Sequence, residues 1–396
     1  MDLSSAEAPK VEAKVLNIQQ RFDIAGHWSG KGQHVEFQKK ETIPLEEGKL
    51  LGRGASADVH EVTCRGLVIA RKQIYCSRRM RLEDVRRELD ILKKLNHKHV
   101  VTLVGSYIQG KVLGLLLLPA AVCDLGVFLD EIEEEQKADT STLGDGLSTV
   151  LERLEVQVQE DSLRPALERL QRVYGCLVKA VQYLHDNNIR HKDLKPRNIL
   201  LDRNDGLFIT DFGISRDNTD ASTSVTAGME RGTYKYCAPE VARFEPRGRA
   251  ADIYSLGCVF LEIRTVVSGM SLTEFDEFRA KGDDHSFQNG QEKTKEWIMK
   301  IRRKQLDIDR LMRPKDNSRQ QIFYMLDLIE RMIEGNPADR PLIGAVSTNL
   351  ELMGRLRNSQ GTQSLFGRCC QVNLHSLEEC KALGKFLAVL HGLVFY

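Results

Sequence analysis

The chain lacks the features of a membrane-spanning protein and of a disulfide-stabilised one. No run approaches the roughly 18 apolar residues that a membrane helix requires, and the polar, acidic N-terminus has no apolar signal core. The nine cysteines are odd in number and scattered, with only Cys369 and Cys370 adjacent and no C-x-x-C pattern. We therefore expect reduced thiols in an intracellular protein, cytoplasmic or nuclear.

An excess of charge of one sign is also missing. The 57 Lys and Arg residues balance 56 Asp and Glu to a net charge of +1, so the total charge indicates no nucleic-acid partner and no anionic membrane. By contrast, 41% of the residues are hydrophobic and 29% are charged, which suits a sizeable core and excludes a disordered chain. The length allows two or three domains, or one large bilobal domain with extensions. The oligomeric state is not indicated.

The pattern of apolar residues changes near position 119. Before it, strand-like segments dominate, and after it helical spacing does. The strands are expected within 43–74, at 100–107 and at 112–118, with a helix over about 82–95. The later helices are expected at 125–135, 163–187, 250–267, 293–304, 320–334 and 342–356, with short strands at NILL and LFIT.

This order predicts an α+β, bilobal fold with a small β-rich N-lobe and a larger, mostly helical C-lobe. The expected divisions are an extension over 1–42, partly ordered at best, a domain over 43–356 with lobes at 43–119 and 120–356, an insertion at about 131–163, and a tail over 357–396. For the insertion, the sequence is equally consistent with a helix and with a loop. The tail's last 14 residues are too few to span a bilayer. We expect them to dock as a helix, with a partner or membrane-surface contact and disorder as the alternatives.

Two segments in the first lobe have the residue types of a phosphate-binding site. Gly52 and Gly54 lie between two strands, where glycine lets backbone N–H groups approach a polyphosphate closely. On the next strand Lys72 has the point charge to reach phosphates, and Glu88 on the following helix has the charge to hold that ammonium. Taken singly, each is more often a plain hairpin or a solvated surface charge.

The second lobe contains a far more specific pattern. The string HKDLKPRN, residues 191–198, precedes one short strand, and DFG, residues 211–213, follows another. A hairpin between these strands would bring Asp193, Asn198 and Asp211 together. Two carboxylates and an amide oxygen are hard ligands suited to Mg²⁺, and a remaining carboxylate can accept a proton from an incoming hydroxyl.

With these motifs in chain order, the sequence resembles the eukaryotic protein kinase family, serine/threonine type, from about Leu50 to Leu356. Further matching pieces are the GT-to-APE segment from Gly232 to Glu240, Asp252, and Arg340 in NPADRP. The hinge segment LLLLPAAVCDL loosely resembles that of divergent fungal kinases. The resemblance implies ATP and Mg²⁺ as cofactors and a protein substrate with Ser or Thr.

The family's roles carry over by position. The resemblance implies that Lys72 binds the α/β-phosphates and pairs with Glu88, that Asp193 is the catalytic base, and that Lys195 stabilises the γ-phosphoryl group. Asn198 and Asp211 would hold Mg²⁺. The implied nucleotide-binding set comprises Leu51, Gly52, Gly54, Val59, Ala70, Lys72, Glu88, the gatekeeper Leu117, the hinge residues Leu118 and Ala120, Asn198, Leu200 and Asp211. Glu240 and Arg340 resemble the family's buried ion pair.

Some residues depart from the family pattern. Ala57 replaces the third glycine of the phosphate loop, and Pro119 removes one backbone donor from the hinge. Lys192 replaces the usual arginine and cannot bind a phosphate bidentately, which puts dependence on activation-loop phosphorylation in doubt. A pseudokinase that acts as an interaction scaffold, and a kinase of small molecules, are the alternatives.

Overall fold

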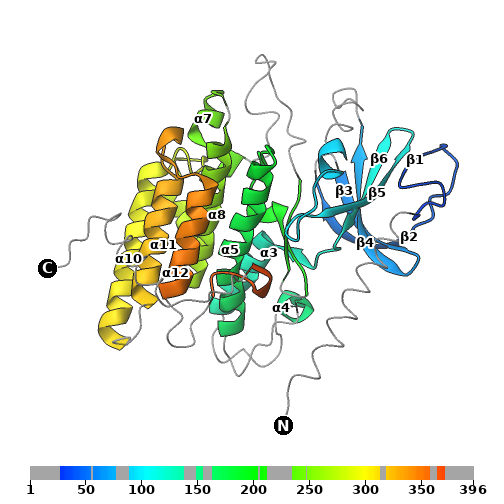
Figure 1. Ribbon diagram of the computed structural model, residues 1–396. Coiled ribbons are helices and arrows are strands. Elements are labelled where there is room, and N and C mark those ends of the chain that lie inside the picture. The colour runs from blue at the N-terminus through cyan, green and yellow to red at the C-terminus, as the bar shows by residue number, and fades with distance from the viewer. Residues whose placement is uncertain are drawn as a thin grey trace, which may run out of the picture. The chain divides into compact units, whose positions relative to one another are not determined.

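The computed structural model in Figure 1 divides the chain into two compact units, named here the sheet unit, Met1–Cys123, and the helical unit, Asp124–Tyr396. The structure describes residues 27–54, 57–76, 89–137, 149–154, 163–203, 206–211, 234–246, 248–312, 318–356 and 364–370. Within the described residues, no helix has the length and apolarity needed to cross a membrane.

The sheet unit is built on one six-stranded sheet with strand order β1-β5-β6-β4-β3-β2. Its strands are β1 (His34–Phe37), β2 (Glu46–Arg53), β3 (Ala57–Cys64), β4 (Leu67–Tyr75), β5 (Thr102–Gln109) and β6 (Val112–Leu118). All neighbours pair antiparallel except β1 and β5, which are parallel. Four of the five strand segments expected in this unit are confirmed in the expected order by β3 to β6, and the fifth is present as β2, which begins later than expected. Of the helix expected over 82–95, only 89–95 is described, and 89–92 is helical.

Part of the expected extension over 1–42 packs on the sheet. From residue 27 onward it belongs to the sheet unit, because Trp28 and Phe37 are buried and lie 6.0 Å apart between ring centroids. Both rings also pack on Tyr107 of β5. Gly105 makes room for this cluster, since a Cβ there would lie 2.3 Å from the indole nitrogen of Trp28. Strand β1 has only four residues, and this pattern is too short for a strand to be predicted from the sequence.

The helical unit packs its long helices around α8. Its elements are α3 (Leu125–Lys137), α4 (Thr149–Arg153), α5 (Arg164–Asp186), η1 (Pro196–Asn198), β8 (Ile199–Leu201), β9 (Leu207–Ile209), α7 (Pro239–Ala242), α8 (Arg249–Val267), α9 (Leu272–Arg279), α10 (Gln291–Met312), α11 (Ser318–Met332), η2 (Pro337–Asp339), α12 (Ile343–Leu356) and η3 (Arg368–Cys370), while β7 (Cys123–Asp124) spans the boundary between the units. Figure 1 shows α8, α10, α11 and α12 side by side, and α5 contacts both α8 and α12. Nearly every residue of α8 from Asp252 to Val266 is buried, so this helix has no polar face, as expected for the core of a large domain.

The expected insertion and tail fall partly outside the described residues. Helix α3 continues to Lys137, and α4 lies farther along, with Leu151 and Leu154 buried. In the tail, residues 364–370 are described, and Leu365 and Phe366 are buried. The helix expected over the last 14 residues lies outside the described residues.

Candidate active site

A short hairpin positions two of the expected metal ligands. Strands β8 and β9 pair antiparallel, with Ile199 opposite Ile209. Asn198 directly precedes β8, and the backbone N–H of Thr210, just after β9, donates to the Asn198 carbonyl at 3.0 Å. Asp211 is the next residue and has a positive φ of 63°, a backbone conformation that few non-glycine residues adopt. The hairpin therefore places Asn198 and Asp211 at the same end.

The carboxylate of Asp193 is held by two neighbours. Its Oδ2 lies 2.9 Å from the ammonium of Lys195, and the Asn198 side-chain amide donates to the same oxygen at 2.9 Å and to the Asp193 carbonyl at 2.7 Å. The Asp193 side chain keeps 20% of its surface exposed. A fixed carboxylate with an open edge is the arrangement that a general base needs.

Asp252, on α8, fixes the backbone of the loop that carries Asp193. Its carboxylate accepts hydrogen bonds from the backbone N–H groups of His191 and Lys192, each at 2.9 Å, and lies 2.9 Å from His185 Nε2. Burial alone would raise the pKa of the Asp252 carboxyl, but the hydrogen bond from His185 and the loop amides outweigh it and hold this pKa below its ordinary value. Lys192 has a φ of 70°, a strained backbone that these contacts stabilise.

The ion pair expected between Glu240 and Arg340 is present. The guanidinium of Arg340 donates to both carboxylate oxygens of Glu240, at 2.7 and 2.8 Å. The side chains are 0% and 3% exposed, and Arg340 also donates to the carbonyls of Ala250, Glu334 and Gly335. Because each N–H group has an acceptor, the buried charge is compensated.

In the sheet unit, the strand register gathers the expected nucleotide-binding residues on one face. Lys72 on β4 is directly opposite Val59 on β3, and Ala70 is opposite Leu117 on β6. Paired residues and residues two apart share a face of a sheet. The sheet unit therefore presents Lys72, a residue that is 8% exposed, beside apolar side chains on one surface.

The glycine-containing turn joins β2 to β3. Gly52 lies opposite Val59, and the Gly54 N–H donates to the Ala57 carbonyl at 2.8 Å. A Cβ at Gly52 would meet no atom within 4 Å. Chain packing does not require glycine at this position, whereas an unobstructed backbone there suits a ligand that approaches closely.

Some expected residues fall outside the described residues, namely Glu88, Phe212, Gly213 and Thr233. Of the remaining ones, Leu51 lies on β2, Leu118 ends β6, Ala120 follows it, and Leu200 lies on β8. His185, which supports Asp252, was not among the residues predicted from the sequence. Nothing in the sequence distinguishes this histidine from other residues of α5.

Comparison with known proteins identifies the family of the chain. The family model described as "Protein kinase domain" matches residues 45–349, and the chain belongs to this family. It is 33% identical over 219 residues to "Serine/threonine-protein kinase fused" of Drosophila melanogaster, covering 54% of this chain and 23% of that one. It is 29% identical to "Serine/threonine-protein kinase 36" of Pongo abelii, covering 46% and 11%. It is 32% identical to "Calcium/calmodulin-dependent protein kinase cmkA" of Emericella nidulans, covering 58% and 48%.

The matched regions thus span less than half the length of each of these three relatives. The fold expected from the sequence, with a β-rich N-terminal part and a helical C-terminal part, is that of the protein kinase domain.

Proposed function

We propose that the chain is a protein serine/threonine kinase that transfers the γ-phosphoryl group of ATP to a hydroxyl of a protein substrate. The proposal rests above all on the Asp193 carboxylate, which Lys195 and Asn198 hold with one edge open, beside the hairpin that carries Asp211. Asp193 orients the substrate hydroxyl and takes its proton. Lys195, next to this carboxylate, stabilises the charge that develops on the γ-phosphoryl group.

The donor set suits Mg²⁺. Because the amide nitrogen of Asn198 faces Asp193, its amide oxygen is left as a neutral, hard ligand. Asp211 supplies a carboxylate from the same end of the hairpin. Mg²⁺ takes one or two such protein oxygens together with phosphate oxygens, and when bound it would neutralise phosphate charge. Lys72, with its apolar neighbours in the sheet unit, is suited to bind the phosphates as a point charge.

Serine/threonine preference is supported by Lys195, two residues after Asp193. It is also supported by the relatives in Drosophila and Pongo, both of which are named as serine/threonine-protein kinases. A cytoplasmic or nuclear location stays a prediction.

The experiment is transfer from γ-labelled ATP to a generic protein substrate with Mg²⁺, for wild type, Lys72→Met and Asp211→Asn. Matched controls are Lys111→Met and Asp186→Asn, which change exposed residues of the same two units. We expect both site variants to lose at least about 100-fold in rate, as when electrostatic stabilisation of the transition state is lost, and both controls to keep their activity.

The alternative is a pseudokinase that acts as an interaction scaffold, which Ala57 and Lys192 favour. ATP-induced thermal stabilisation without turnover in the wild type would support it. Equal label transfer by the wild type and both site variants would reject the catalytic proposal.

A further inference from the structure

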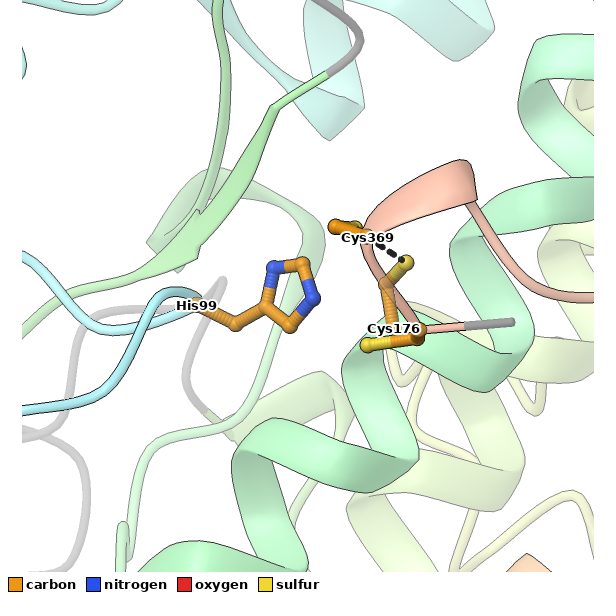
Figure 2. Close-up of side chains that lie close together, drawn as sticks. His99, Cys176 and Cys369 are labelled. Carbon is orange, nitrogen blue, oxygen red and sulfur yellow. Dashed lines mark hydrogen bonds between the residues drawn. The ribbon is translucent and has the colours of Figure 1, made fainter. Parts of the chain in front are cut away.

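A cluster of three thiols includes none of the residues assigned to catalysis. Cys176 is on α5, and Cys369 and Cys370 are on η3, the turn that ends the described part of the tail. In Figure 2 the side chain of Cys369 approaches Cys176 from a segment that is far away in the sequence. The sulfur ligand atoms of the three residues all lie within 4.8 Å of one another.

The spacing of the sulfurs suits a shared metal ion. The Sγ atoms of Cys176 and Cys369 are 3.7 Å apart. A tetrahedral zinc ion with Zn–S bonds of about 2.3 Å separates its sulfur ligands by about 3.8 Å, whereas a disulfide needs about 2.05 Å. None of the eight cysteines among the described residues forms a disulfide.

The surrounding backbone is shaped for this cluster. The N–H of Gly367 donates to Cys176 Sγ at 3.3 Å, and a hydrogen bond of this kind stabilises a thiolate and orients it for a metal. A Cβ at Gly367 would lie 2.9 Å from Cys176 Sγ and 3.3 Å from Cys369 Sγ, so glycine is required for the segment to approach both sulfurs. On the helix, the Gly175 N–H donates to the Leu365 carbonyl at 2.9 Å.

A bound cation would change the protonation of these thiols. The neighbouring thiols of Cys369 and Cys370, together with burial, raise the pKa of the Cys176 thiol. Without a cation, several thiolates at this spacing would repel one another. A bound divalent metal reverses this penalty and deprotonates its thiol ligands outright.

We propose that Cys176, Cys369 and Cys370 bind one Zn²⁺ as thiolates, with the fourth tetrahedral position taken by a further ligand. Each thiol gives up its proton to the solvent on binding. The site joins residues 193 positions apart and attaches the segment Ser364–Cys370 to α5. It is a structural site, and it does not depend on the proposed kinase activity.

The test uses the full chain purified under reducing conditions without chelator. Zinc content is measured by elemental analysis, and affinity is measured by competition with a chromophoric chelator. The variants are Cys176→Ser, Cys369→Ser and Cys370→Ser, with Cys76→Ser as the control, since Cys76 lies in the sheet unit. We expect about one zinc per chain in wild type and control. In each cluster variant the zinc affinity should fall by more than about 10–100-fold, which is the loss typical when only an outer-shell partner is removed.

A second measurement does not require the variants to fold. Cobalt substituted for zinc in the wild type should give a thiolate-to-metal charge-transfer band, and zinc should protect these three cysteines from alkylation, mapped by mass spectrometry. No zinc binding by the wild type, alkylation of all three thiols unchanged by zinc, or cluster variants that bind zinc as the control does would each overturn the proposal. A Cys176–Cys369 disulfide that forms despite the reducing conditions and added zinc would also overturn the proposal.

Discussion

The side-chain amide of Asn198 donates to Asp193 twice, at 2.9 Å to the carboxylate and at 2.7 Å to the backbone carbonyl. One residue thereby fixes both the side chain and the main chain of the proposed base. Because its nitrogen is used in this way, its oxygen is the atom left for a ligand. Under the proposed function, positioning of the base and binding of Mg²⁺ are therefore coupled through a single amide.

This coupling predicts a double defect for Asn198→Ala. Hydrogen bonds to charged groups contribute about 1.5–3 kcal/mol each, so we expect kcat to fall by at least about tenfold. The Mg²⁺ concentration for half-maximal rate should also rise, because a ligand is lost. Steady-state rates over a series of Mg²⁺ concentrations measure both effects. Asn349→Ala is the control, since Asn349 is a half-buried residue of α12 whose side chain donates to the Ala345 carbonyl. If Asn198→Ala kept the Mg²⁺ dependence of the wild type, the proposed role of Asn198 as a metal ligand would be contradicted.

The buried carboxylate of Asp252 predicts a pH-dependent stability difference. Its pKa in the folded protein is below its ordinary value of 3.8, so its stabilisation is fully present above that value. It is lost as the pH falls through the lower folded pKa. At neutral pH, Asp252→Asn should lose about 3 kcal/mol or more, because the hydrogen-bonded charge is removed.

Urea unfolding of wild type and Asp252→Asn over a pH series measures this difference. We expect the gap in unfolding free energy to be constant near neutrality and to shrink below pH 3.8. Asp186→Asn, a change at an exposed residue near the end of the same α5 helix as His185, should show no gap at any pH. A gap for Asp252→Asn that is unchanged on acidification would contradict the role given to its charge.

Burial should determine how much each of two ion pairs near the end of α7 contributes to the free energy of unfolding. Arg340→Met leaves the Glu240 carboxylate buried without its partner, which typically costs about 3–5 kcal/mol. The pair Arg243–Glu245 is exposed, with side chains 59% and 48% accessible, and Arg243→Met should change stability little. Thermal and urea unfolding of both variants make the comparison. Equal effects would show that burial of the pair has no energetic consequence here.

Much of the architecture follows from local patterns in the sequence. The apolar spacing over 163–187 and 250–267 predicted α5 and α8 almost to the residue, because long helices repeat their pattern over several turns. Two short apolar runs likewise predicted the β8–β9 hairpin, and with it the approach of Asn198 and Asp211. These inferences needed only neighbours in the sequence.

Contacts between segments that are distant in the sequence could not be predicted from such local patterns. Strand β1 is held by parallel pairing with β5, with His34 opposite Ser106, and a four-residue strand has no periodicity of its own to detect. The thiol cluster joins Cys176 to a turn 193 residues later. Adjacent cysteines at 369 and 370 were visible in the sequence, but their partner on α5 was not.

The docking of the tail segment on α5 predicts a clash that a second substitution relieves. A Cβ at Gly175 would lie 2.2 Å from the ring of Phe366, which is buried and has little room to move. Gly175→Ala should therefore lose about 1–3 kcal/mol, the usual cost of overpacking. Because Phe366→Ala removes the obstructing ring, Gly175→Ala should cost much less in that background, and a double-mutant cycle by urea unfolding measures the coupling. Gly354→Ala in α12, where a Cβ meets nothing within 4 Å, should instead stabilise by about 0.5–1 kcal/mol, as alanine does in a helix. If Gly175→Ala behaved like Gly354→Ala in the wild-type background, Phe366 would not pack against this face of α5 in solution.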